Sequence, residues 1–266
     1  MTSQNSSEPA RIDPLWTPVP ARCEKHGDFE ARRFSNAFSL PPITTGCPMC
    51  AQERAAEDRA REIEQVRRAE QYRIAVLFGR SGIPKRFQDR TLENFITTVP
   101  AQARTLAIAR SFVDAFTRVE GASLILCGKP GTGKTHIACG IAHAIIDGGK
   151  SAVFATVLSA IRHIKDTYRK DSERSESDAV NDFLAPALLV LDEVGAQVGS
   201  EHEKLLLFEI INERYQRCLS TILISNLTQD ELGVYLGDRV MDRFREDGGI
   251  VAFDWDSHRG TREPQT

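Results

Sequence analysis

Short apolar runs alternate with segments of helical spacing over the C-terminal two thirds of the chain. Five apolar runs predict buried strands: Ser123–Cys127, Ser151–Thr156, Ala187–Leu191, Ser220–Ser225 and Ile250–Phe253. Apolar residues at helical intervals predict helices over 101–119, 136–146, 157–169, 203–218, 230–235 and 237–245. The polar stretch 171–178 is expected to be a loop. This alternation predicts an α/β fold in which a parallel five-stranded sheet lies between helices.

The N-terminal part has a different pattern. Six acidic and six basic residues interleave over 51–78, which predicts a helix with a thin apolar stripe of Ile63, Val66, Ile74 and Leu77. A solvated connecting helix is the simpler interpretation, and a partner-docking helix is the alternative. Gly79–Pro84 breaks this helix and opens the main domain. We therefore expect a mobile polar tail at 1–20, a small module at 21–50, a connecting helix at 51–78, a main domain at 79–260 and a tail at 261–266.

Composition adds the setting of the protein. The net charge of −3 does not by itself indicate nucleic acid, although it leaves room for a local basic patch. No apolar run is long enough to span a bilayer, and the N-terminus lacks the pattern of a signal peptide. The six cysteines are not spaced as a disulfide framework. These features predict a cytoplasmic protein that does not enter a membrane.

The segment Gly128–Thr135 carries the most specific chemistry. It reads Gly-Lys-Pro-Gly-Thr-Gly-Lys-Thr between a predicted strand and a predicted helix, which is the context of a phosphate-binding loop. Lys134 would reach the β- and γ-phosphates of ATP, and the Thr135 hydroxyl would bind Mg²⁺. The predicted nucleotide contacts are Gly128, Lys129, Pro130, Gly131, Thr132, Gly133, Lys134, Thr135 and His136. The preceding segment 85–95 either lines the base of the nucleotide or packs against the domain.

Two acidic residues follow the third predicted strand of the main domain. Asp192 lies at a strand's carboxyl end, where open α/β sheets bind ligands, and can hold the Mg²⁺ with Thr135. Glu193 can polarise the attacking water, which indicates a hydrolase. Because Lys134 and Asp192 are 58 positions apart, we expect another strand between the two motif strands in the sheet. Asn226 ends the next strand and either contacts the water or γ-phosphate or caps the chain locally.

A short predicted helix over 237–245 carries three arginines. Arg239 and Arg243 are four positions apart and share a face, and Arg245 follows them. A guanidinium suits the charge that develops on a transferring phosphoryl group, in the same subunit or in a neighbour. Ion pairs with Asp238 and Asp242 are the alternative role.

The N-terminal module contains two pairs of metal-binding residue types. Cys23 and His26 form one pair, and Cys47 and Cys50 form the other. Pairs with this spacing suit a tetrahedral zinc ion, since thiolates and imidazole favour zinc over Ca²⁺ or Mg²⁺. We expect a structural or partner-binding site with a small core of Phe29, Phe34 and Phe38. Three incidental cysteines with a surface histidine are the alternative.

From about Ser81 to Arg259 the chain resembles the DnaC-type replicative helicase loaders. These are AAA+ ATPases related to the initiator DnaA and to the IstB-type transposition helper ATPases. The resemblance is carried by Ser81–Pro84 with Glu93–Phe95, the phosphate loop, Ile164–Arg169, Leu191–Gly195, Gly237–Arg243 and Phe253–Arg259. The phosphate loop is common to many ATPases, whereas the last two segments together are far more specific. The cysteine pairs depart from the helical helicase-binding extension of these loaders.

This resemblance implies roles for individual residues around the nucleotide. Asn226 corresponds to sensor 1, and Arg259 corresponds to the sensor 2 arginine. Arg243 corresponds to an arginine finger offered to the neighbouring subunit, with Arg239 beside it. The ATP site would therefore be completed by self-association.

The resemblance also implies a DNA-binding surface. Tyr168 corresponds to an aromatic residue that contacts single-stranded DNA, and the nearby Lys165 and Arg169 suit phosphate contacts. Ser200 and His202 fall on a second DNA-contacting segment, with His202 where the family often has an aromatic residue.

Three functions are compatible with this sequence. The first is an ATP-dependent loader that delivers a replicative hexameric helicase onto single-stranded DNA. The second is a transposition helper ATPase that acts on duplex DNA. The third is a zinc adaptor with a degenerate ATPase core, which the intact Lys134 and Glu193 argue against.

Overall fold

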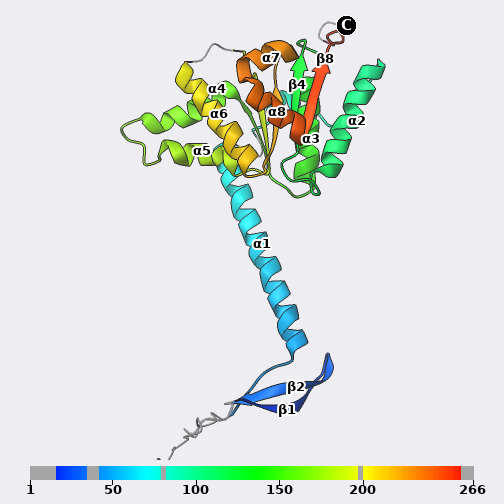
Figure 1. Ribbon diagram of the computed structural model, residues 1–266, viewed down its shortest axis with the longest axis vertical. Helices are drawn as coiled ribbons and strands as arrows, with labels where there is room; N and C mark the ends of the chain where they lie inside the picture. Colours follow the sequence, from blue (N-terminus) through cyan, green and yellow to red (C-terminus); the bar gives the residue numbers. More distant parts are fainter. Residues whose placement is uncertain (1–15, 35–41, 79–81, 197–199, 259–266) are drawn as a thin grey trace, which may run out of the picture. The chain divides into compact units, whose positions relative to one another are not determined.

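The computed structural model describes residues 16–34, 42–78, 82–196 and 200–258 (Figure 1). Its contacts divide the chain into two compact units, Met1–Arg68 and Ala69–Thr266, and each is described by itself. Residues 1–15 of the predicted N-terminal tail and the whole predicted C-terminal tail lie outside the described residues. None of the described helices combines the length and the apolar character that crossing a membrane requires.

The first unit contains an antiparallel sheet that the sequence did not predict. Over the described residues its strand order is β1-β2-β3, formed by β1 (Trp16–Cys23), β2 (Gly27–Phe34) and β3 (Ile43–Thr44). β1 begins inside the segment that was expected to be a tail. Pro18 and Pro20 are tolerated there because β1 is an edge strand, where a missing N–H breaks no second ladder.

The phenylalanine core expected for this unit is not seen among its described residues. Among its described residues, the buried apolar side chains are Ala31 and Cys47, while Phe29 and Phe34 are only half-buried. The Phe34 ring lies 5.1 Å from the ring of Trp16, centroid to centroid. Phe38 lies outside the described residues. The described part of this unit therefore buries few apolar side chains, and a domain with so small a core usually depends on a metal, disulfides or oligomerisation.

The predicted charged helix is α1 (Pro48–Phe78), which begins three residues earlier than expected. Glu64 forms ion pairs with Arg67 and Arg68 at 2.9 and 2.8 Å, at the spacing that supports isolated helices. Ile63 and Val66 are 70% and 64% exposed. The side chains of Ile74 and Leu77 lie outside the described residues. The described part of the stripe therefore fits the solvated interpretation.

The second unit confirms the predicted parallel sheet. Within its described residues the strand order is β5-β6-β7-β4-β8, and every neighbouring pair is parallel. The strands are β4 (Ser123–Gly128), β5 (Ala152–Thr156), β6 (Leu188–Asp192), β7 (Ser220–Ile224) and β8 (Gly248–Phe253). β7 lies between β4 and β6, so the expected strand between the two motif strands is present.

Helices cover both faces of this sheet (Figure 1). Leu188 and Val190 join a core with α2 (Pro100–Ala115) and α3 (Lys134–Asp147) on one face. Leu189 and Leu191 face the other way, because side chains alternate along a strand. The helices on that second face are α4 (Val157–Lys165), α5 (Glu176–Leu184), α6 (Glu201–Gln216), α7 (Gln229–Leu236) and α8 (Asp238–Asp247). Two short 3₁₀ helices are η1 (Lys85–Phe87) and η2 (Asp166–Tyr168).

Two sequence predictions on this second face need correction. The helix expected over 157–169 ends at Lys165 and tightens into η2. The loop expected over 171–178 ends early, because α5 begins at Glu176. Ser175 caps α5 by accepting the N–H of Asp178 at 3.1 Å, and Asp178 accepts the N–H of Ser175 at 3.0 Å. This Ser-x-x-Asp pattern was the available sequence signal.

Candidate functional site

The phosphate loop connects β4 to α3 through left-handed glycines. Gly128, Gly131 and Gly133 have φ values of 115°, 78° and 99°. A Cβ at Gly128 would lie 2.5 Å from the carbonyl oxygen of Phe253, and one at Gly133 would lie 2.8 Å from the Phe95 ring. Only glycine therefore fits at these two positions, one at each end of the loop. The turn that they allow keeps the N–H groups of the loop near the N-terminus of α3. Lys129 and Pro130 are exposed on the same loop.

Lys134 and Thr135 occupy the first turn of α3. The Lys134 ammonium is buried, and it donates to the carbonyl oxygens of Gly128 and Lys129 at 2.7 Å each. Phosphate oxygens are better partners for an ammonium than carbonyl groups, because they are charged. The Thr135 hydroxyl donates to Oδ2 of Asp192 at 3.1 Å. The loop and the predicted carboxylate therefore meet in one site.

Asp192 and Glu193 differ in their surroundings. Burial raises the pKa of Asp192, while the Glu193 N–H donates to its Oδ1 at 2.7 Å and stabilises the ionised form. Hard oxygen donors from Asp192 and Thr135 fit Mg²⁺, which prefers a few protein oxygens and substrate phosphates. Glu193 is exposed and has a φ of 64°, a left-handed conformation unusual for a residue with a side chain. Asn226 is also exposed, at the carboxyl end of the intervening β7.

The segment after β8 packs on the outside of the loop, and sequence reasoning missed these contacts. Lys129 N–H donates to the Phe253 carbonyl at 2.9 Å, and His258 N–H donates to the Gly131 carbonyl at 3.0 Å. The Trp255 indole N–H donates to the Thr132 carbonyl at 3.0 Å. The bonds to Gly131 and Thr132 use loop carbonyls as acceptors, whereas the N–H of Lys129 already donates to Phe253. Arg259 directly follows this segment and lies outside the described residues.

His136 is among the predicted nucleotide contacts, and the structure shows the packing partners of its side chain. Its Nε2 lies 2.9 Å from the Thr91 carbonyl oxygen and 2.8 Å from Oδ1 of Asn94. Its ring meets the edge of Phe95 at 5.2 Å between centroids, and burial lowers its pKa. His136 therefore holds the segment before α2 against the phosphate-loop helix. For the residues around Thr91–Phe95, the packing alternative fits the structure.

The arginines of α8 have different partners. Arg245 forms an ion pair with Asp242 at 2.6 Å, and Arg239 is exposed. Arg243 does not form the ion pair with Asp238 or Asp242 that was the alternative role for these arginines. Its Nη1 donates to Oδ1 of Asn212, and its guanidinium lies 4.4 Å from the centroid of the Tyr215 ring.

Two of the predicted DNA-binding residues, Lys165 of α4 and Tyr168 of η2, contact the start of α6. The Tyr168 hydroxyl donates to Glu176 and lies 2.9 Å from Nε2 of His202 at the start of α6. Burial and Glu176 raise the pKa of Tyr168 to about 12, although half of the residue is exposed. Lys165 forms an ion pair with Glu203 at 2.6 Å. Arg169 is exposed, and Ser200 caps α6.

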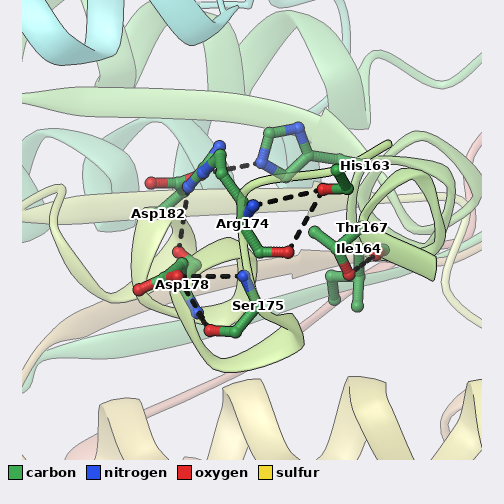
Figure 2. A network of polar contacts seen from close by, with 8 residues as sticks. His163, Ile164, Thr167, Arg174, Ser175, Asp178 and Asp182 are labelled. Atoms are coloured by element: carbon green, nitrogen blue, oxygen red, sulfur yellow. Dashed lines mark hydrogen bonds and ion pairs between the residues drawn. The ribbon is translucent and has the colours of Figure 1, made fainter. Parts of the chain in front are cut away.

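A buried carboxylate joins α5 to α4. Figure 2 shows Asp182 between His163 and Arg174. Its Oδ2 lies 2.8 Å from His163 Nε2 and accepts from Arg174 Nη2 at 2.5 Å. Asp182 is 1% exposed, so both partners compensate its desolvation. This network ties α5 to α4 and was not predicted from the sequence.

Known proteins share this arrangement. The sequence profile of IstB-like ATP binding proteins matches residues 59–264. The replicative helicase loader DnaC of Escherichia coli (strain K12) is 36% identical over 239 residues, which span 88% of this chain and 95% of that protein. The chain belongs to the IstB-like ATP-binding family, in the group of the DnaC helicase loaders.

Solved structures agree with this membership. A crystal structure of the DnaC helicase loader matches the IstB-like chain with a TM-score of 0.59 and 27% identity, over 64% of this chain and all of that one. The replication initiator DnaA bound to AMPPCP and single-stranded DNA matches with a TM-score of 0.55 and 22% identity, over 65% of this chain and 51% of that one. The second likeness shows a common fold. The predicted AAA+ fold and family are confirmed.

The IstB-like match begins at residue 59, so the cysteine pairs lie outside it. The ligand atoms of Cys23, His26, Cys47 and Cys50 all lie within 4.8 Å of one another. The Cys23 and Cys50 sulfurs are 3.6 Å apart, and His26 Nδ1 is 3.3 Å from Cys50 Sγ. A tetrahedral zinc ion with Zn–S bonds of about 2.3 Å separates its sulfurs by about 3.8 Å. The donor set therefore fits zinc.

The electrostatics of the cluster also suit a cation. Hydrogen bonds from backbone N–H groups, first that of His26, lower the pKa of Cys23 to about 6. The side-chain hydrogen bond with Cys23 raises the pKa of Cys50 to about 11. A divalent cation between the sulfurs would stabilise both thiolates.

Glu53 of α1 is a further residue of this cluster that the sequence did not reveal. His26 directs Nδ1 toward the thiols, and its Nε2 lies 3.2 Å from Oε1 of Glu53. Lys25 donates to the other Glu53 oxygen at 2.6 Å. A carboxylate on the far nitrogen of a metal-binding histidine orients the ring and selects its tautomer.

Proposed function

We propose that this protein is an ATP-dependent loader that delivers a replicative hexameric helicase onto single-stranded DNA during replication initiation. The identity with a replicative helicase loader over 88% of the chain carries this proposal. The geometry adds support, because the phosphate loop, Asp192 and Glu193 meet at one edge of the sheet.

In the proposed reaction, the loop N–H groups bind the β-phosphate of ATP, and Lys134 exchanges its carbonyl partners for phosphate oxygens. Thr135 and Asp192 would hold Mg²⁺, which neutralises charge on the β- and γ-phosphates when bound. Glu193 polarises the attacking water, and Asn226 orients it or the γ-phosphate. Gly128–Thr135 would form the phosphate cradle, and the proposed nucleotide contacts extend to His136, which directly follows it.

We further propose that the ATP site is completed by self-association. Arg243, with Arg239 beside it, would reach the γ-phosphate held by a neighbouring subunit, and Arg259 would contact nucleotide in its own subunit. Tyr168 would stack on a base of single-stranded DNA while Lys165 and Arg169 contact phosphates. The ion pair between Lys165 and Glu203 must open for that contact, whereas Arg169 is already exposed.

Copurification tests this function and its alternative. We expect a replicative hexameric helicase to copurify with the protein, with an affinity that changes at least several-fold when ATP is added. Single-stranded DNA should stimulate hydrolysis more than duplex DNA of equal length. The family match to IstB-like proteins favours the second candidate, a transposition helper. Stimulation by duplex alone, with no helicase bound, would establish that candidate instead.

A structural zinc ion is part of the proposal, held by Cys23, His26, Cys47 and Cys50. The first unit would gain from it stability beyond that of Ala31 and Cys47, the buried apolar side chains among its described residues. The proposed organisation is a zinc-binding module that includes β1, a connecting helix at 51–78 and an ATPase domain at 79–260. All six cysteines are free, which supports a reducing, cytoplasmic location.

We expect about one equivalent of zinc in the purified protein and loss of that zinc in Cys47→Ser. Glu53→Gln should keep the cluster but weaken zinc binding about 10- to 100-fold, because the His26 ring loses its carboxylate. Glu57→Gln, on an exposed part of the same helix, is the matched control. Metal analysis and competition with a chromogenic chelator measure both effects. Substoichiometric zinc, with folding unchanged after chelation, would contradict the site.

A further inference from the structure

Arg243 is held by neutral side chains although a carboxylate lies on the same helix. Asp242 pairs with Arg245, while Arg243 donates to the Asn212 amide oxygen and stacks on Tyr215. A carboxylate partner would cancel much of the charge of a guanidinium. An amide oxygen and a ring face orient the fork but leave its net charge at +1. Arg243 is thus oriented without being neutralised.

The two partners of Arg243 are themselves well supported. Asn212 and Tyr215 are three positions apart on α6 and therefore share a face. The Tyr215 hydroxyl donates to Glu246 of α8 at 3.2 Å. Next to them, Ile210 and Ile211 of α6 share one buried core with Val240, Met241 and Phe244 of α8. The holder is therefore part of the rigid packing of the two helices.

We infer that Asn212 and Tyr215 are positioning residues for Arg243, and that they set the reach of its guanidinium toward phosphate bound by a neighbouring copy of this chain. This inference rests on the proposed trans action of Arg243. A long arginine side chain that is already oriented loses less conformational entropy when it meets the phosphate. Neutral holders also release it more readily than a carboxylate would.

Mixed assemblies can test the role in the subunit that donates the finger. Arg243→Ala keeps an intact nucleotide site but lacks the finger, whereas Glu193→Gln keeps the finger but lacks the general base. Each alone should hydrolyse ATP slowly in the presence of Mg²⁺ and oligo-dT. Mixed together, they should recover at least about tenfold, because Glu193→Gln subunits offer Arg243 to the competent sites.

The holders are then changed only in the Glu193→Gln donor. Adding Asn212→Ala or Tyr215→Leu should reduce the recovered rate about 5- to 10-fold, whereas Tyr215→Phe, which keeps the ring, should reduce it less than twofold. Asn212→Asp is the most informative change, because it keeps an oxygen for Arg243 but neutralises the guanidinium. A mixture with this donor should not recover its ATPase rate, while the unfolding temperature of the variant stays the same or rises. Arg217→Ala, on an exposed ion pair of α6, is the matched control.

The outcomes separate the two ideas. The parent mixture is Arg243→Ala with Glu193→Gln. If its ATPase rate recovers, and recovers equally when the donor also carries a change at Asn212 or Tyr215, the positioning inference is wrong and the trans finger stands. If the parent mixture does not recover, the trans finger fails and the inference fails with it. Loss of recovery in Asn212→Asp with an intact fold supports the inference, since a purely structural contact would tolerate that change.

Discussion

Glu193→Gln lowers the turnover of ATP by about 100-fold or more and leaves nucleotide affinity within about twofold of the parent. A positioned general base contributes about 10²–10⁴ to rate, and the amide cannot accept the proton. Binding survives because the loop and Lys134 make the phosphate contacts, while the Glu193 side chain is exposed. The substitution also preserves side-chain size at a residue with a φ of 64°, so it adds no backbone strain.

Phosphate release at saturating ATP and Mg²⁺, together with titration of a fluorescent nucleotide, measures this separation. Glu201→Gln, an exposed carboxylate at the start of α6, should behave like the parent. Lys134→Ala gives the opposite pattern, since it removes a buried ammonium from the loop and should abolish nucleotide binding. Parent-like hydrolysis by Glu193→Gln would exclude it as the base. Parent-like affinity in Lys134→Ala would remove the loop from the site.

The nucleotide site was predictable from the sequence because its determinants are local. The glycines of the loop require left-handed or crowded positions that other residues cannot adopt, so their spacing specifies one turn. The strands β4 to β7 of the main sheet are buried on both faces and appear as continuous apolar runs. The position of Asp192 at the end of such a run then identifies the edge of the sheet where it acts.

Features that depend on distant contacts were not predictable in the same way. Nothing local indicates that Arg243 will stack on Tyr215, or that Trp255 will bond to the phosphate loop. His136 follows the loop directly, yet its partner is a carbonyl 45 positions earlier in the chain. Strand β1 was missed because its prolines argue against a strand until its edge position is known. Helix α5, by contrast, carried a capping signal that the polar composition around it concealed.

The α6 residue Arg214 is another feature that its sequence context does not reveal. Its side chain has no exposed surface. Its guanidinium donates to the Thr221 hydroxyl and to backbone carbonyl oxygens, and this set of acceptors comprises Phe183, Pro186, Ala187 and Ser220. The carbonyls come from the end of α5, the segment before β6 and the start of β7. One side chain therefore joins the C-terminal end of α5 to the N-terminal starts of β6 and β7.

Burial lowers the pKa of Arg214 to about 9, so the group is still charged at neutral pH. Its acceptors are mostly backbone carbonyls, which no side-chain substitution can remove. Arg214→Met would fill much of the volume but leave those oxygens buried without donors, at about 1–3 kcal/mol for each group that water cannot reach. A buried ion pair can sometimes be replaced by apolar side chains because both partners are exchanged. Such a double replacement is not possible here, since most partners of Arg214 belong to the backbone.

We therefore expect Arg214→Met to lower the free energy of unfolding by about 3–5 kcal/mol, a large part of the 5–15 kcal/mol typical of a whole domain. Arg214→Lys should fall between it and the parent, because one ammonium cannot reach acceptors spread around a planar fork. Arg217→Ala, which removes an exposed ion pair one turn later, should change stability by less than about 1 kcal/mol. Denaturant titration of the full chain distinguishes these cases. A loss below about 1 kcal/mol in Arg214→Met would mean that water reaches the carbonyls, and α5 would then be attached to the sheet less firmly than its contacts with α4 and α6 imply.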